Sequence, residues 1–134
     1  MNQRFAACSC GQLSVSCQGE PIRVSICHCL ACQKRTGSVF GTQARFNREQ
    51  VKAITGKSTA YTRKADSGNE LTFHFCPECG STVYYWLNDM PDVIAIPVGA
   101  FADPTFRAPV FSVYESRRHG WVVLPDGPDV EHMD

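Results

Sequence analysis

The segment Cys76-Pro77-Glu78-Cys79-Gly80 carries two thiols close enough in sequence to bind one metal ion. Thiolates at this spacing can hold a single zinc ion, and Gly80 lets the backbone turn tightly around it. We call Cys76 and Cys79 the knuckle. A tetrahedral zinc site needs two more thiolates, which other parts of the chain must supply. Because such an ion would join distant segments, the knuckle predicts a zinc-stabilised fold.

The missing thiolates can come from either of two groups, the N-terminal pair Cys8-Ser9-Cys10 or the triplet Cys27-His28-Cys29-Leu30-Ala31-Cys32. If the N-terminal pair completes the site of the knuckle, the triplet offers three thiolates to a second metal. If Cys29 and Cys32 complete it instead, as in a zinc ribbon, the other three cysteines remain unpaired. The first partition leaves fewer unpaired thiols. Three protein ligands with an open fourth position are typical of a catalytic zinc.

Two residues could close the second site and make it structural. Cys17 shares a strand face with Leu13 and Val15, which favours a packed core thiol over a ligand. His28 lies between two cysteines of the triplet, so in an extended segment its side chain would point away from their metal. A closed site completed by either residue stays open as an alternative. It would favour a non-catalytic zinc-binding module for protein interaction.

The composition of the chain limits the classes of binding partner that we expect. Of 134 residues, thirteen are basic, thirteen are acidic and eight are cysteines. Zero formal net charge argues against nucleic acid or an anionic membrane as the partner.

The first residues lack the apolar stretch of a secretory signal, and no window is apolar enough to span a membrane, so we expect a cytoplasmic protein. In that reducing compartment clustered cysteines are more often metal ligands or redox groups than disulfides. We rank a redox CxxC pair last, because the βαβ context of thioredoxin-like proteins is missing.

Alternating apolar and polar residues predict a mainly β fold of antiparallel sheets. The alternation is clearest in residues 13–17 and 71–75, and one short helix is expected after Phe46, capped by Asn47 and ended by Gly56. We expect a single domain over residues 1–134, with a surface tail from about residue 125. Further strands are expected at Val39–Phe46, Thr82–Leu87, Val93–Val98, Phe111–Glu115 and Trp121–Leu124.

The cysteine segments together resemble the signature of a known family. They read Cys8-Ser9-Cys10-Gly11, Cys27-His28-Cys29-Leu30-Ala31-Cys32-Gln33-Lys34-Arg35-Thr36-Gly37 and Phe75-Cys76-Pro77-Glu78-Cys79-Gly80-Ser81. Their order, spacing and flanking glycines are similar to those of the glutathione-dependent formaldehyde-activating enzyme family, which also contains the centromere protein V relatives. The likeness runs from about Cys8 to Pro125.

This resemblance implies a β-tent fold and two zinc ions per chain. The structural zinc would be held by Cys8, Cys10, Cys76 and Cys79, and the catalytic zinc by Cys27, Cys29 and Cys32. The implied activity belongs to the carbon-sulfur lyase class: glutathione adds to formaldehyde and gives S-hydroxymethylglutathione. The implied partners are therefore a small-molecule thiol and a small aldehyde.

The chemistry of the triplet agrees with that activity. Three thiolates leave a divalent zinc with a net negative charge, so it is a poor Lewis acid and a soft fourth ligand suits it better than hydroxide. A substrate thiol bound there would be deprotonated and nucleophilic. Glutathione also has two carboxylates, which need cationic or amide partners. The candidates for these contacts are Gln33, Lys34, Arg35, Thr36, Gly37 and Arg45.

Overall fold

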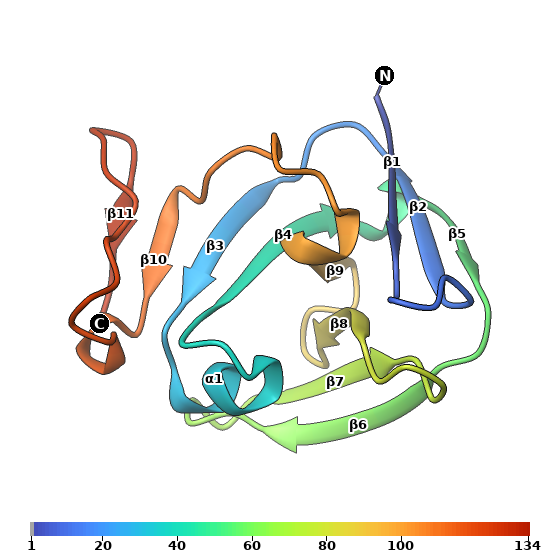
Figure 1. The fold of residues 1–134 in the computed structure, drawn as a ribbon, viewed down its shortest axis with the longest axis horizontal. Coiled ribbons are helices and arrows are strands. Elements are labelled where there is room, and N and C mark those ends of the chain that lie inside the picture. The colour runs from blue at the N-terminus through green and yellow to red at the C-terminus, as the bar shows by residue number, and fades with distance from the viewer. Residues whose placement is uncertain (1) are drawn as a thin grey trace.

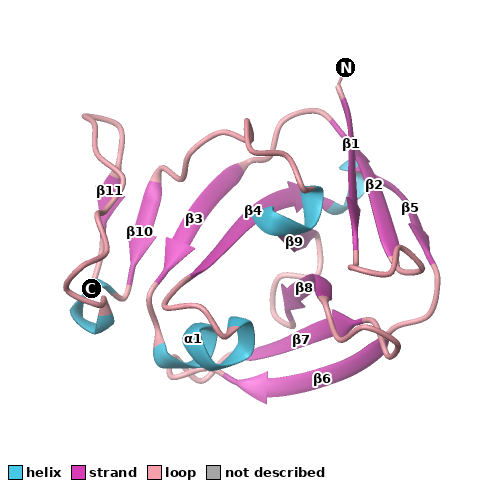
Figure 2. Ribbon diagram, viewed as in Figure 1, coloured by secondary structure: helices cyan, strands magenta, loops and turns pink. Residues whose placement is uncertain are grey.

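Strands dominate the structure of this chain. The computed structural model describes residues 2–134, which form two sheets and one α-helix, α1, at Leu30–Thr36 (Figure 1, Figure 2). The prediction of a mainly β protein with one short helix is therefore confirmed. No helix within residues 2–134 has the length and apolar character that crossing a membrane requires.

The two sheets differ in size. The smaller has the order β1-β2-β5, and the larger has the order β11-β10-β3-β4-β9-β8-β7-β6. Neighbouring strands are antiparallel, except that β10 runs parallel to both β3 and β11. The strands span β1 Gln3–Ala7, β2 Ser14–Gln18, β3 Arg23–Cys27, β4 Gly41–Asn47, β5 Val51–Thr55, β6 Thr59–Lys64, β7 Glu70–Phe75, β8 Thr82–Leu87, β9 Val93–Pro97, β10 Phe111–Val113 and β11 Glu131–His132.

The hydrophobic core joins the two sheets, and β4 separates it from a cavity. Ala44 and Phe46 of β4 are fully buried in a cluster that includes Val15 of β2. The alternate residues Gln43 and Arg45 line a cavity instead. Because successive side chains of a strand point to opposite faces, one strand serves both a packed core and a cavity wall.

The predicted helix after Phe46 is wrong in its position. Asn47 donates its backbone N–H to Oε1 of Gln50 at 2.8 Å, as the expected cap requires, but only the 3-10 turn η1 at Arg48–Gln50 follows. The Gln50 amide also bonds to carbonyl oxygens outside the turn, and the chain continues as β5, which pairs with β2. Strand pairing thus overrides the weak helical pattern of residues 47–56.

The C-terminal segment also differs from expectation. Residues 121–124 form no strand, and the side chains of Trp121 and Val123 are 72% and 90% exposed. Beyond residue 125 the chain is mostly exposed, and Glu131–His132 pairs with β10 as an edge strand. The sequence pattern does not predict four of the strands, β1, β3, β5 and β6. They are short, and apolar and polar residues mostly do not alternate along them.

A close approach at Gly56 ties β5 to the loop after β1. Gly56 has φ +100°, and a Cβ atom there would overlap the carbonyl oxygen of Gln12. The side chain of Gln12 continues this contact, because its amide donates to the carbonyl of Lys57 at 2.7 Å and accepts from the N–H of Lys57 at 2.9 Å. The Gln12 loop is therefore fixed from both its backbone and its side chain.

We predict that Gly56→Ala destabilises the zinc-loaded protein far more than Gly68→Ala. Gly68 has a similar φ of +94° but open space around it. Alanine there should lower the free energy of unfolding only through backbone strain, by about 1–2 kcal/mol. Alanine at position 56 must also displace the backbone of Gln12. Urea unfolding of both variants measures the difference, and equal losses of unfolding free energy would contradict the proposed contact.

Candidate metal centres and the adjoining cavity

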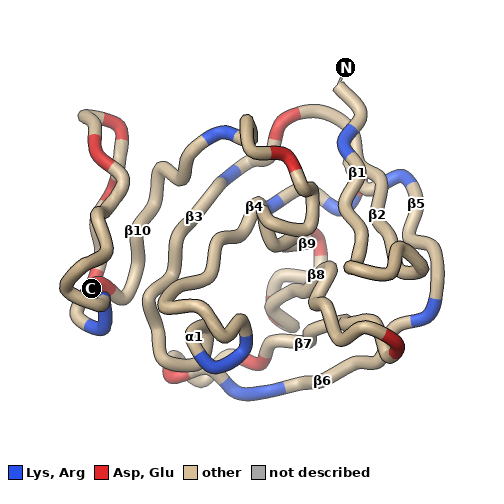
Figure 3. The backbone as a smooth tube through the Cα atoms, in the orientation of Figure 1, with Lys and Arg blue, Asp and Glu red and all other residues tan. Residues whose placement is uncertain are grey.

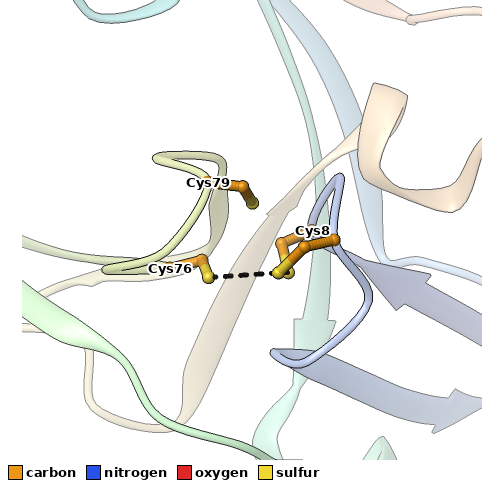
Figure 4. A group of neighbouring side chains, drawn as sticks. Cys8, Cys76 and Cys79 are labelled. Carbon is orange, nitrogen blue, oxygen red and sulfur yellow. Dashed lines mark hydrogen bonds between the residues drawn. The ribbon is translucent and has the colours of Figure 1, made fainter.

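The N-terminal pair and the knuckle lie together in the structure. The four Sγ atoms of Cys8, Cys10, Cys76 and Cys79 all lie within 4.8 Å of one another. Figure 4 shows the sulfurs of Cys76 and Cys79 turned toward the loop that carries Cys8. The Cys8–Cys10 and Cys10–Cys76 sulfur distances are 3.6 and 3.7 Å. Zinc bonded to four sulfurs separates them by roughly 3.8 Å, so this donor set fits one tetrahedral ion.

Hydrogen-bond donors surround this group of sulfurs. The Gln12 amide donates to Sγ of Cys76 at 3.0 Å, and the backbone N–H of Leu13 donates to Sγ of Cys8 at 3.3 Å. The backbone N–H of Ser81 and then its hydroxyl lower the pKa of Cys79 to about 5. Metal binding requires deprotonated cysteines, so these donors prepare the site for a cation.

The triplet forms a second group where β3 meets α1. The Sγ atoms of Cys27, Cys29 and Cys32 also lie within 4.8 Å of one another. Cys27 ends β3, and Cys29 caps α1 by accepting a hydrogen bond from the N–H of Cys32 at 3.3 Å. Hydrogen bonds from the Cys27 and Cys32 thiols lower the pKa of Cys29. The short helix thus brings three sulfurs to one point, where they could hold a second metal ion.

The zinc-ribbon partition does not match this geometry, because Cys29 and Cys32 group with Cys27 and not with the knuckle. Cys17 belongs to neither group. It is fully buried in the core on β2, and burial raises its pKa to about 11. His28 is fully buried as well, with Nε2 bonded to the hydroxyl of Ser112 at 3.2 Å and its ring packed edge-on against Phe40. Neither residue joins the triplet as a fourth ligand.

A cavity of about 190 Å³ adjoins the triplet and is rich in arginine. Arg35 of α1, Arg45 of β4 and Arg63 of β6 line it, and Asp66 is the one carboxylate in its wall. No ion pair within residues 2–134 involves any of these arginines. Figure 3 shows basic residues on both α1 and β6, the elements that supply two of them. The cavity therefore presents an excess of positive charge beside the thiols.

Aromatic side chains contact two of these cations. The guanidinium of Arg35 lies 5.0 Å from the ring centroid of Phe73 and 5.2 Å from that of Tyr85. Arg63 lies 5.3 Å from the same Phe73 ring. Cation–π contact at these distances orients a guanidinium without consuming its hydrogen-bond donors. Arg35 is thereby positioned to bind an anion in the cavity.

The predicted substrate contacts divide between the cavity wall and positions outside it. Arg35 and Arg45 line the cavity. The other four residues lie outside its wall. Gln33 bonds to the carbonyls of His28 and Arg117, the Thr36 hydroxyl bonds to the carbonyl of Cys32, Gly37 caps the helix, and Lys34 is exposed.

Several cavity residues lie outside the motifs that mark the site in the sequence. Gln43 could have been found, because it alternates with Arg45 along one strand and must share its face. Arg63, Asp66 and Tyr85 could not, because only the pairing of β6, β7 and β8 brings them to the triplet.

Fold and site together define a small β protein with two cysteine groups that could hold metal ions, consistent with zinc. A family model described as "Glutathione-dependent formaldehyde-activating enzyme" matches residues 3–117. The chain therefore belongs to this family.

Comparison with curated proteins finds no match. Among solved structures, the chain is similar to a protein described as "Crystal structure of Rhodobacter sphaeroides protein", a structural genomics target. The TM-score is 0.58 at 17% sequence identity, and the alignment covers 75% of this chain and 91% of the other. At this identity the likeness supports the fold alone.

We predict two zinc ions per chain, with different consequences when each group loses a thiol. Cys27→Ser should lower the zinc content by one ion and leave the fold intact, because the triplet lies beside a cavity. Cys76→Ser should lower both zinc content and folding stability, because Cys76 is buried in the core cluster. Elemental analysis and thermal unfolding measure both effects. Cys17→Ser is the control, and loss of zinc from it would contradict the assignment.

Proposed function

We propose that this protein is a zinc-dependent enzyme of the carbon-sulfur lyase type. It binds a thiol such as glutathione and adds it to formaldehyde or another small aldehyde, which gives an S-hydroxymethyl adduct. The observation that carries this proposal is the position of the triplet, whose three sulfurs line an arginine-rich cavity. Membership of the glutathione-dependent formaldehyde-activating enzyme family supports it.

The two metal sites have separate roles in this proposal. Cys8, Cys10, Cys76 and Cys79 would form a closed set around a structural zinc. Cys27, Cys29 and Cys32 would hold the catalytic zinc through three sulfurs. When bound there, zinc would accept the substrate thiol as a fourth ligand and favour its thiolate form.

The side chains of the cavity bind and orient the thiol. Arg35, Arg45 and Arg63 supply donors for the two carboxylates of a glutathione-like substrate. Leu71, Leu87 and Ala95 supply apolar wall and limit the access of water. A carboxylate anchored on a fixed guanidinium places the thiol sulfur reproducibly beside the triplet.

The reaction forms one carbon-sulfur bond and needs no redox partner. A sulfur lone pair attacks the carbonyl carbon, and the carbon-oxygen π electrons move to oxygen. The oxygen then takes up one proton, which matches the proton that the thiol loses. The enzyme contributes proximity and a deprotonated nucleophile, and the same residues serve the reverse reaction.

The remaining properties fit a cytoplasmic enzyme with small-molecule substrates. None of the eight cysteines forms a disulfide within residues 2–134, which suits a reducing compartment. The balance of thirteen basic and thirteen acidic residues gives no support for a nucleic-acid partner. We take residues 1–134 as a single catalytic domain.

A thiol panel tests the proposed activity. The zinc-loaded protein is mixed with formaldehyde and with glutathione or other cellular thiols, and the consumption of free aldehyde is followed against the spontaneous addition. We expect acceleration with glutathione and little with thiols that lack carboxylates. If no thiol reacts faster than it does without protein, the non-catalytic zinc module becomes the better account.

Arg35→Met should raise the KM for glutathione about tenfold, because one charge-assisted contact to a carboxylate is lost from the cavity wall. Lys64→Met is the matched control, since it removes the same charge from an exposed site outside the cavity. Steady-state kinetics compare the two. Equal effects would show that only net charge matters and would contradict a bound carboxylate.

A further inference from the structure

Tyr85 of β8 brings a phenol to the cavity beside the triplet. The residue lines the same cavity as the three cysteines. Its neighbour Tyr84 is buried in the core cluster instead, because successive side chains of a strand point to opposite faces. The direction of the Tyr85 side chain is therefore set by the same alternation that separates core from cavity along β4.

The ring of Tyr85 is packed on several sides. It contacts its cross-strand partner Phe73 of β7 at a centroid distance of 4.8 Å. Its partner on β9 is Ala95, and the three residues form a small buried cluster. The guanidinium of Arg35 lies 5.2 Å from the Tyr85 ring centroid. A phenol packed in this way presents its hydroxyl at a fixed position, as pre-organised catalysis requires.

The hydroxyl of Tyr85 is unpaired but not closed off. No hydrogen bond to another residue acts on it. The side-chain atoms within residues 2–134 that are both enclosed and unpaired are Nδ1 of His28, Nε of Arg35, Oε1 of Gln43 and Nε of Arg118. The oxygen of Tyr85 is not among them, so it keeps accessible surface. Because the residue lines the cavity, a small molecule there can reach the hydroxyl.

The surroundings of this hydroxyl match those of a reaction centre. Burial raises its pKa, so the phenol stays protonated at neutral pH and remains a hydrogen-bond donor. The charges that act on it come from Arg35, Cys32, Cys27 and Arg45. The hydroxyl is thus within electrostatic reach of the sulfurs beside the proposed nucleophile and of the arginines proposed to bind its carboxylates.

We propose that Tyr85 is a catalytic residue, whose hydroxyl donates a hydrogen bond to the aldehyde oxygen while the substrate thiol attacks the carbonyl carbon. This inference rests on the proposed function and adds the group that receives the electrophile. As the carbon-sulfur bond forms, the carbon-oxygen π electrons move to oxygen, where a fixed donor stabilises the developing charge. The phenol keeps its own proton. The oxygen takes its proton from solvent, which has received the one that the thiol loses.

The other donors of the wall suit this role less well. The arginines serve the carboxylates of the thiol in the proposed function. The hydroxyls of Ser67 and Tyr114 belong to segments between strands, outside the cluster that packs Tyr85, and Ser67 is exposed to solvent. A hydrogen bond to developing charge is stronger in an enclosed site than in water. Formaldehyde offers one polar atom, so one fixed neutral donor is enough to orient it.

Tyr85→Phe tests the proposal, with Tyr84→Phe as the matched control. Each change removes one hydroxyl from β8 and keeps the ring, but Tyr84 faces the core. Consumption of formaldehyde in the presence of glutathione, corrected for the spontaneous addition, gives kcat for the zinc-loaded proteins. Isothermal titration without aldehyde gives the Kd for glutathione, and thermal unfolding gives the Tm.

We expect Tyr85→Phe to lower kcat about a hundredfold, because a donor to the developing oxyanion is lost. The Kd for glutathione and the Tm should stay the same, since the hydroxyl bonds neither to the thiol nor to another residue. Tyr84→Phe should leave both kcat and Kd unchanged.

Three results would overturn the inference and leave the proposed function in place. The first is an unchanged kcat in Tyr85→Phe. The second is a rise in its Kd for glutathione as large as the fall in kcat, because the hydroxyl would then bind the thiol and not the aldehyde. The third is a lower kcat with an equally lowered Tm in both variants, as two structural tyrosines would give. If the wild-type protein does not accelerate the addition, the proposed function itself fails.

Discussion

The contact between the N-terminal pair and the knuckle is the constraint on which the rest of the structure depends. Cys8 follows β1 in the smaller sheet, and Cys76 follows β7 in the larger sheet, so one group of four sulfurs joins both. Both residues are buried in the core cluster that the sheets share. Gln12 extends the constraint, because it contacts Cys76 on one side and Lys57 on the other. A metal at this point would therefore fix the loops around it as well as the sheets.

The two faces of the larger sheet have different roles, because one packs in the core and the other lines the cavity. Ala44 and Phe46 of β4 pack in the core, whereas Gln43 and Arg45 line the cavity. At the end of β3, Cys27 lies opposite Gly41 of β4, which brings the triplet to the same cavity. The stability of the core thus supports a cavity wall that carries arginines and three thiols.

The sequence predicted the parts of this arrangement that depend on local spacing and on counting. The grouping of the cysteines follows from leaving the fewest thiols unpaired, and strands such as Thr82–Leu87 follow from composition and turn signals. Residues 47–56 carry a helical pattern, but pairing of Val51–Thr55 with β2 outweighs it. The helix at Leu30–Thr36 was missed since its cap is the sulfur of Cys29, which is not among the usual capping groups. Arg63 and Tyr85 reach the cavity only through strand pairs that single-sequence reasoning does not reveal.

The central claim is that the triplet holds a metal whose fourth position is open to a substrate thiol. The most direct test is the visible absorption of the cobalt-substituted protein, recorded before and after glutathione is added. We predict two bound cobalt ions per chain, and a spectral change on adding glutathione that is absent from a variant with Cys27→Ser. A spectrum that already corresponds to two closed four-sulfur sites and does not respond to the thiol would contradict the account.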